Sequence, residues 1–149
     1  MTSVRTRSVR RQFFVRAPPG RVFRAMSRPE ELARWMVESA DLPLRRGARC
    51  RLVFQGGWVH EGKVLSVRPG RGFTLSWAWP GVPLERTSLT LSVRPVRAGA
   101  LVLIEHKGFP RAERWVDLYG VTEWGWTYYG MNLKSVLEAG HDLRAEQDG

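Results

Sequence analysis

The chain has 149 residues, of which 43% are hydrophobic and 11% aromatic, enough to fill the core of one domain. No apolar run approaches the roughly 18 residues that a membrane helix needs, and the basic N-terminus carries no apolar stretch before Pro18, so we expect a cytoplasmic protein without membrane insertion. Cys50 is the sole cysteine, which excludes an internal disulfide and a cysteine-rich zinc site.

The formal net charge is +10, and all but three of the 24 basic residues are arginines. Such a charge is either an electrostatic footprint for nucleic acid or anionic lipid, or a set of solvated side chains in an arginine-rich composition. The arginines are spread along the chain, with local clusters at Arg5, Arg7, Arg10 and Arg11 and at Arg45, Arg46, Arg49 and Arg51. No nucleic-acid motif accompanies them, so specific nucleic-acid binding is not expected.

The chain begins with one strand and two short helices. Val9 to Arg16 alternates between apolar and polar residues, which predicts a strand. Pro19 suits the first turn of a helix that carries Val22, Phe23 and Met26. A second short helix is predicted from Pro29 through Trp35, with carboxylates in its first turn.

Strand patterns separated by Gly and Pro turns fill the middle of the chain. Five further strands are predicted, at Ala48–Phe54, Trp58–Val67, Phe73–Trp79, Thr87–Val93 and Leu101–His106. Their short connections favour antiparallel pairing. A loop over Pro110–Gly120 and a long helix over Val121–Ala139 complete a single domain, residues 9–143, with flexible tails at residues 1–8 and 144–149.

Four motifs occur in a characteristic order: Pro18–Met26 (PPGRVFRAM), Pro29–Trp35 (PEELARW), His106–Phe109 (HKGF), and Gly125-Trp126 followed by Leu133, Leu137 and Glu138. In order and spacing the chain resembles the SRPBCC or START-like superfamily, in the branch named for activators of the HSP-90 ATPase. The resemblance implies an α+β helix-grip (Bet v-like) fold, in which a curved antiparallel sheet of about six strands wraps around the long C-terminal helix and two short helices follow the first strand. Members of the family hold apolar or amphipathic ligands between sheet and helix, and some use that space as an active site.

The long helix presents Trp126, Gly130, Leu133 and Leu137 on one face, which we expect to meet the sheet. Gly130 leaves a gap in the middle of that face. The gap either widens a cavity, allows close packing of helix on sheet, or is filled by a neighbouring aromatic ring. If it widens a cavity, replacing Gly130 with Leu should weaken probe binding without loss of stability.

His106 shares a strand face with Val102 and Ile104 and is expected to point inward. It either contacts a polar ligand group or moves a proton, or it is a structural histidine bonded to backbone. The predicted ligand-binding set is Trp77, Val102, Ile104, His106, Trp126, Tyr129, Gly130 and Leu133. The three histidines lack ligand spacing and no Gly-rich phosphate loop joins a strand to a helix, so no metal or cofactor is expected.

These patterns predict a protein that binds an apolar or amphipathic small molecule between sheet and helix. The alternatives are an enzyme of cyclase or hydrolase type using His106 or a tyrosine, and a chaperone-interacting module. A further surface is predicted on the opposite helix face, where Trp124, Tyr128 and Met131 cannot meet the sheet. Either the Pro110–Gly120 loop covers these three residues, or they form a homodimer interface.

Overall fold

Within the residues that the computed structural model describes, 5–79, 81–84 and 87–148, seven antiparallel strands form one curved sheet. In chain order the strands are β1 (Thr6–Val15), β2 (Ser39–Asp41), β3 (Arg49–Val53), β4 (Val59–Arg68), β5 (Gly72–Trp77), β6 (Thr87–Val96) and β7 (Gly99–Pro110). Across the sheet they lie in the order β1-β7-β6-β5-β4-β3-β2. Strands β2 to β7 therefore form a meander, and β1 joins it beside β7.

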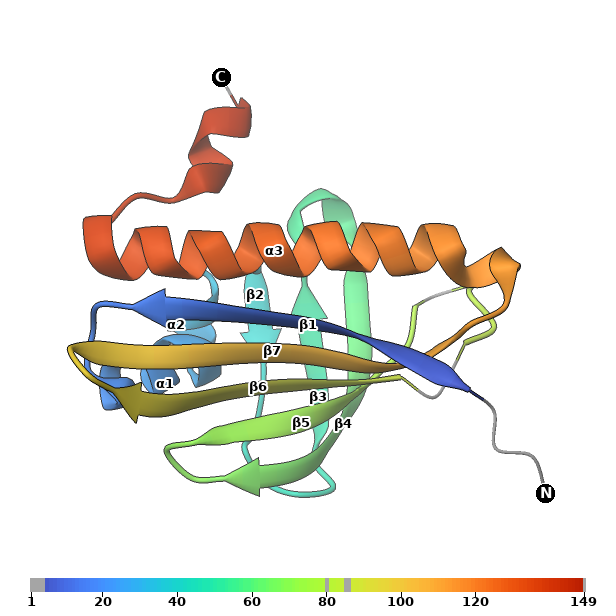
Figure 1. Cartoon of the computed structure of the whole chain (residues 1–149), viewed down its shortest axis with the longest axis horizontal. Helices are drawn as coiled ribbons and strands as arrows, with labels where there is room; N and C mark the ends of the chain where they lie inside the picture. The colour runs from blue at the N-terminus through green and yellow to red at the C-terminus, as the bar shows by residue number, and fades with distance from the viewer. Residues whose placement is uncertain (1–4, 80, 85–86, 149) are drawn as a thin grey trace.

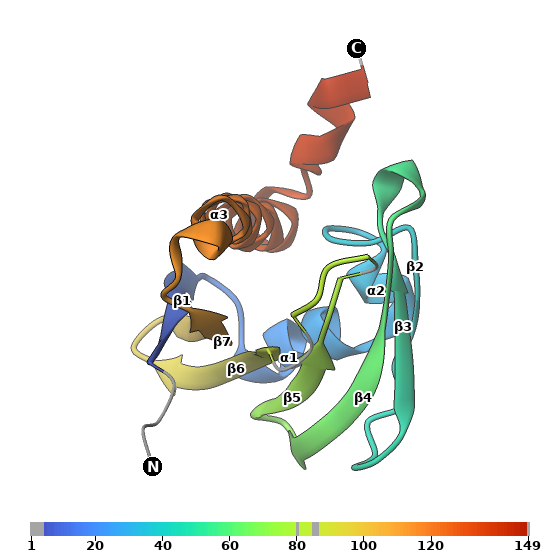
Figure 2. The same ribbon diagram turned by 90° about the vertical axis from the view of Figure 1, so that its right-hand side faces the viewer.

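The helices lie at one end and on one face of this sheet. Helices α1 (Pro19–Ser27) and α2 (Pro29–Leu32) follow β1, and α3 (Val116–Ala139) runs across the sheet (Figure 1). Figure 2 looks along α3 and shows the sheet curving around it. Three short 3-10 helices, η1 (Gln55–Gly57), η2 (Glu113–Trp115) and η3 (Leu143–Asp148), occur in the connections. The predicted helix-grip architecture is confirmed.

Alternation along the strands decides which face of the sheet is covered. On β6, Leu89, Leu91 and Val93 are buried, whereas Ser92 and Arg94, which alternate with them along the strand, reach the surface. The apolar side chains pack towards α1 and α3, and the other face of the sheet is solvated, as is usual for an antiparallel sheet.

The long helix packs on the sheet through the predicted face. Trp126, Gly130 and Leu133 are buried there, which confirms that prediction. The space beside Gly130 is filled by the ring of Phe13 from β1, and a Cβ atom on Gly130 would overlap that ring. Gly130 therefore does not widen a cavity; of the three alternatives, a neighbouring aromatic fills the gap. A leucine at this position would collide with Phe13, so the substitution is not expected to leave stability intact.

Several boundaries differ from the sequence prediction, including the end of α2 at Leu32 and the end of β7 at Pro110. The segment between the second short helix and the strand predicted at Ala48–Phe54, where no strand was predicted, contains the short strand β2, which makes seven strands instead of about six. Helices η2 and α3 together cover residues 113–120, so most of the expected Pro110–Gly120 loop is helical. Strand β1 begins at Thr6, inside the tail expected at residues 1–8; residues 1–4 and 149 lie outside the described part of the chain.

The C-terminal segment, expected to be flexible after residue 143, is fixed by a buried arginine. Helix α3 ends at Gly140, whose φ of 67° is left-handed, and the chain turns back. Arg144 donates hydrogen bonds to the carbonyl oxygens of Ala33 (2.8 Å) and Val37 (3.1 Å), beside α2. Burial alone would raise the pKa of Asp142, but hydrogen bonds donated by Arg144 and Asn132 lower it to about 2. This network closes the end of α3 onto the α1–α2 segment.

Candidate ligand-binding site

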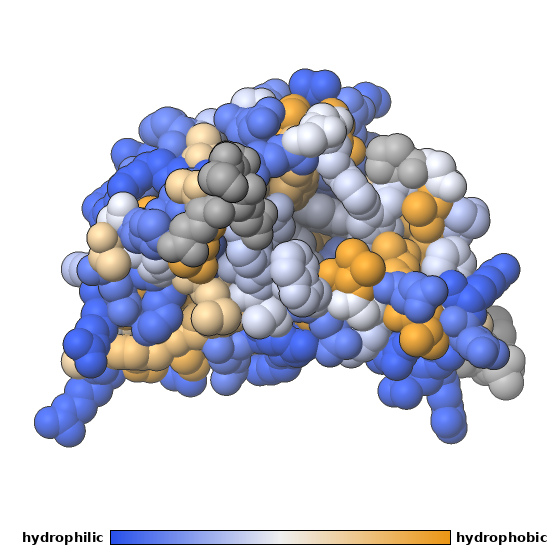
Figure 3. All heavy atoms as spheres, turned by 90° about the horizontal axis from the view of Figure 1, so that it is seen from above, coloured by the Kyte–Doolittle hydropathy of each residue, from blue (hydrophilic) through white to orange (hydrophobic). Residues whose placement is uncertain are grey.

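A cavity of about 250 Å³ lies between the sheet and the N-terminal half of α3. Aromatic rings make most of its wall: Phe54, Trp58, Trp77, Trp79, Trp124, Trp126 and Tyr129. The remaining lining residues are Gln55, His106, Leu118, Val121, Thr122 and Gly125. Viewed from the α3 side, apolar side chains gather over the N-terminal half of the helix (Figure 3). Among the described residues that line the cavity, none is Asp, Glu, Lys or Arg.

The cavity unites half of the predicted ligand-binding residues. Trp77, His106, Trp126 and Tyr129 line it. The other four do not border it: Val102, Ile104 and Leu133 are buried in the core, and Gly130 packs under Phe13. The physical reason is that Phe13 closes the middle of the groove between helix and sheet, which leaves open space nearer the start of α3.

Sequence reasoning missed the residues that complete the wall. Phe54 and Trp58 flank η1 at the tip of the β3–β4 hairpin, and Leu118 belongs to a segment predicted as loop. An apolar signal was present, since Phe54 and Trp58 are large aromatic residues on either side of the Gly56-Gly57 turn. Nothing in the local pattern indicates that this turn lies against a helix far along the chain.

A chain of hydrogen bonds fixes the inner wall of the cavity. The indole N–H of Trp126 donates to Nδ1 of His106 (3.0 Å). An indole nitrogen can only donate, so Nδ1 accepts and the ring proton lies on Nε2, which donates to Oγ1 of Thr87 (3.0 Å). The Thr87 hydroxyl in turn donates to the carbonyl oxygen of Trp77 (2.6 Å). One continuous chain therefore links α3, β7, β6 and β5.

His106 is consequently neutral and fully bonded. It is wholly buried, and its ring stacks on Trp79 at a centroid distance of 5.4 Å. Burial, with a smaller contribution from nearby His60, lowers the pKa of His106 to about 3. Both ring nitrogens are occupied by protein partners, so the imidazole offers neither a free base nor a free donor to a molecule in the cavity.

His60 supports the wall from behind. Its ring stacks on Trp77 at a centroid distance of 3.7 Å and an interplanar angle of 11°. Nδ1 faces the carbonyl oxygen of Ala78 and Nε2 that of Ser76, each at 3.1 Å. A neutral imidazole has one N–H and can bond one of these oxygens at a time; burial nevertheless lowers the pKa of His60, which favours that neutral form.

Tyr129 contributes a polar atom that is left for a ligand. Its hydroxyl makes no hydrogen bond to any described residue, while its ring contacts those of Phe54 and Trp126. Burial raises the pKa of Tyr129, so the phenol keeps its proton and can donate it in a hydrogen bond. Thr122, by contrast, already donates to the carbonyl oxygen of Leu118 (2.7 Å) within α3.

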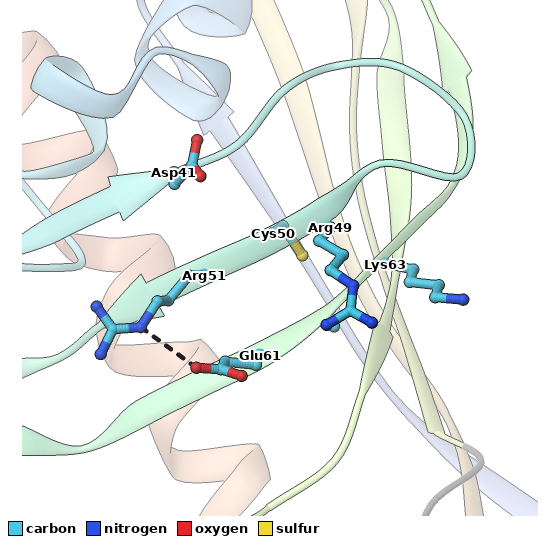
Figure 4. A pocket seen from close by; sticks show the side chains of 7 residues that line it. Asp41, Arg49, Cys50, Arg51, Glu61 and Lys63 are labelled. Atoms are coloured by element: carbon cyan, nitrogen blue, oxygen red, sulfur yellow. Dashed lines mark hydrogen bonds and ion pairs between the residues drawn. The ribbon is translucent and has the colours of Figure 1, made fainter.

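A second hollow, of about 460 Å³, lies on the outer surface of β2, β3 and β4 and differs in chemistry. Its walls carry Asp41, Arg49, Arg51, Glu61 and Lys63, with Arg51 Nε donating to Glu61 at 3.3 Å (Figure 4). Cys50 lies between the two arginines on β3, but its side chain is buried and burial raises the pKa of the thiol. The thiol therefore stays protonated and is a poor nucleophile.

Two kinds of feature are absent from the described part of the chain. No helix there is both long and apolar enough to cross a bilayer. Nor do three or more His, Cys, Asp or Glu side chains gather there closely enough to hold a metal ion.

Comparison with known families identifies the fold family. The family model for "Activator of Hsp90 ATPase homolog 1-like protein" matches residues 16–138, most of the chain. The chain belongs to this family. The resemblance predicted from the four sequence motifs is thereby confirmed. A comparison with curated proteins found no significant match.

Solved structures share the family fold at low sequence identity. Protein MLL2253 from Mesorhizobium loti is 24% identical, with a TM-score of 0.79 over 91% of this chain and 99% of that one. An Aha1 dimer from Colwellia psychrerythraea is 18% identical, with a TM-score of 0.78 over 90% and 98%. CalU16 from Micromonospora echinospora is 22% identical, with a TM-score of 0.69 over 97% and 81%. At these identities the likeness establishes the fold.

Proposed function

We propose that the protein binds a small, neutral, largely aromatic molecule in the cavity between the sheet and α3. The observation that carries this proposal is the composition of the wall, in which seven aromatic side chains line the space and no described lining residue is Asp, Glu, Lys or Arg. Flat apolar ligands gain both burial and ring contacts in such a site. A charged ligand would lose its hydration without gaining a counter-ion.

The size of the cavity limits the ligand. A buried apolar cavity of roughly 150 Å³ accommodates a benzene molecule. The present cavity, at about 250 Å³, fits a molecule with two fused or linked rings. Trp58 and Trp124, which are 49% and 65% exposed, stand at its open side, so larger substituents can extend into solvent.

The polar groups favour binding over proton-transfer catalysis. His106 is held neutral and bonded on both ring nitrogens, so it is unsuited to act as a general acid or base near neutral pH. The hydroxyl of Tyr129 remains to donate one hydrogen bond, which suits a ligand with a carbonyl, ether or hydroxyl oxygen.

Two glycines of α3 provide a matched test. Gly125 lines the cavity and Gly120 does not, and a Cβ atom at either position meets open space. Gly125→Leu should fill the cavity mouth and weaken binding of the neutral fluorescent probe N-phenyl-1-naphthylamine by about tenfold or more, since tenfold corresponds to a binding free energy of about 1.4 kcal/mol. Gly120→Leu should leave probe affinity unchanged. Both changes should raise helix stability by up to about 1 kcal/mol, because leucine is the better helix former.

Probe fluorescence titrations and urea unfolding of the wild type and of the two variants test this proposal. A loss of affinity confined to Gly125→Leu, with both variants folded, supports the cavity as the site. Equal affinity in all three proteins, or no saturable binding by the wild type, would show that the cavity does not take ligands of this class.

A second candidate role is self-association through α3. Trp124 and Met131 are 65% and 53% exposed, and Tyr128 stacks on Trp124 at 5.4 Å. The Pro110–Gly120 segment does not cover them: its Tyr119 packs against Phe109 and donates a hydrogen bond to the carbonyl oxygen of Ser8 (2.8 Å). We propose that Trp124, Tyr128 and Met131 form a homodimer interface, and the Colwellia relative with this fold is itself a dimer.

A further inference from the structure

The outer face of the sheet, away from α3, carries a hollow of about 400 Å³ bordered by four arginines. Arg10 comes from β1, Arg68 from the end of β4, Arg71 from the β4–β5 turn and Arg94 from β6. These residues are far apart in sequence, but the strand order brings them around one depression. Gln12 and Ser92 contribute polar groups to the same wall.

On β5, the position that pairs with Arg68 of β4 on one side and with Ser92 of β6 on the other is a glycine, Gly72. A Cβ atom on Gly72 would lie 2.9 Å from both Cα and Cβ of Ser92, so the packing demands glycine at this position. None of the described residues that line the hollow belongs to β5, and the apolar side chains of Val93, Leu101 and Leu103 complete its wall among the arginines.

The arginines around this hollow carry more positive charge than nearby carboxylates balance. Arg10 pairs with Glu105 at 3.3 Å, and Glu105 also pairs with Lys107. Arg68, Arg71 and Arg94 form no ion pair with any described residue. Small neutral side chains occupy the outward positions of β5 and the outward positions that precede Arg94 on β6: Thr74, Ser76, Ser88, Thr90 and Ser92.

The hollow of Figure 4 provides the contrast. There Arg49, Arg51 and Lys63 share the surface with Asp41 and Glu61, and Arg51 is already paired. Positive charge at that site is largely compensated by the protein itself. At the outer-face hollow, three guanidinium groups repel one another without an internal anion, and a bound anion would relieve that repulsion.

We propose that the outer-face hollow binds a compact oligophosphate group, a diphosphate or a longer linked chain of phosphoryl groups. The planar guanidinium group donates two parallel hydrogen bonds to phosphate oxygens, and three such groups match the charge of a diphosphate. The amide of Gln12 and the hydroxyl of Ser92 supply neutral donors. A depression of this volume takes one small polyanion and gives no extended groove for a polymer.

Calorimetric titration with inorganic diphosphate tests this site on the intact protein. The wild type should bind one diphosphate per chain, and Arg68→Gln and Arg94→Gln should each weaken binding by about tenfold, the loss of one charge-assisted contact. Arg49→Gln and Lys63→Gln remove the same charge from the other hollow and should change affinity by less than about twofold, since exposed charges beyond a Debye length are screened at physiological salt. All four side chains are exposed, and urea unfolding verifies that each variant is folded.

Two further ligands distinguish the source of the phosphate. A single-stranded oligonucleotide and vesicles containing phosphatidylglycerol are titrated under the same conditions. Diphosphate binding that depends on Arg68 and Arg94 supports the proposal. Equal weakening by all four substitutions, or Arg68-dependent binding of oligonucleotide or vesicles without binding of diphosphate, would overturn it.

Discussion

At the scale of single residues, the state of His106 shapes the chemistry of the cavity. Its neutral ring, with the proton on Nε2, follows from the donor-only indole of Trp126 on one side and the hydroxyl of Thr87 on the other. The same bonds hold Trp77 and Trp126, two walls of the cavity, in fixed positions. Of the alternatives that the sequence left open for His106, the structural one applies, with side-chain partners in place of the backbone.

Thr87→Val should expose this role. The change keeps the shape of the side chain but leaves the Nε2–H of His106 and the carbonyl of Trp77 without partners, which should lower the free energy of unfolding by about 1–3 kcal/mol. Urea unfolding followed by circular dichroism measures the loss.

Thr90→Val is the matched control on the same strand. Thr90 points to the outer face, where its hydroxyl bonds to that of Thr74 at 2.8 Å, so its removal should cost less than about 0.5 kcal/mol. Similar losses in both variants would mean that the buried hydrogen-bond chain contributes little.

At the scale of elements, α3 carries three glycines at intervals of five, and each has a different surrounding. Gly120 faces open space, Gly125 borders the cavity and Gly130 receives the ring of Phe13. Helix propensity alone would treat them alike, because each costs about 1 kcal/mol relative to alanine. Tertiary packing separates them.

Gly130→Ala should therefore destabilise the protein, by about 1–3 kcal/mol, because the new methyl group overlaps the Phe13 ring and forces it to move. Gly120→Ala should instead add up to about 1 kcal/mol. Thermal or urea unfolding compares the two. If the double variant Gly130→Ala with Phe13→Leu does not recover stability, the overlap is not the cause of the loss.

Sequence patterns predicted elements where a segment's own residues decide its structure. Alternation on β7 and the apolar face of α3 predicted that Trp126, Leu133, Val102 and Ile104 face inward, and all four are buried, although three of them do not border the cavity they were expected to line. The patterns failed where a residue far away in the sequence determines the packing. Phe13 belongs to a strand more than a hundred residues before Gly130, so no local signal shows that its ring fills the helix gap.

The same reason explains the incomplete site and the C-terminal tail. Half of the predicted lining residues border the cavity. The lining that was missed includes Phe54 and Trp58, because the position of their hairpin against α3 depends on the curvature of the whole sheet. Arg144 looked like part of a solvated tail, yet carbonyl groups of Ala33 and Val37, from the other end of the chain, hold it. Local sequence patterns do not predict such contacts between distant residues.

At the scale of the whole molecule, the exposed surface of α3 predicts association. Replacing Trp124 and Met131 with Glu should convert a dimer into a monomer, because two charges would face each other across the interface. Sedimentation velocity at high micromolar concentration measures the mass. Leu65→Glu, at an exposed apolar position on β4, should leave the dimer intact. A monomeric wild type at that concentration would end the dimer proposal.

The crowding of tryptophan around one cavity makes the protein its own optical reporter. Five of the seven tryptophans line the site, and the other two, Trp35 and Trp115, are buried elsewhere. Trp58 and Trp124 at the rim are exposed to solvent, whereas Trp77 and Trp126 are buried. Their emission spectra therefore differ in the protein without ligand. An occupant would displace water from the rim and shift the emission to shorter wavelength. Unlabelled protein can therefore be screened against compound libraries by its intrinsic fluorescence alone.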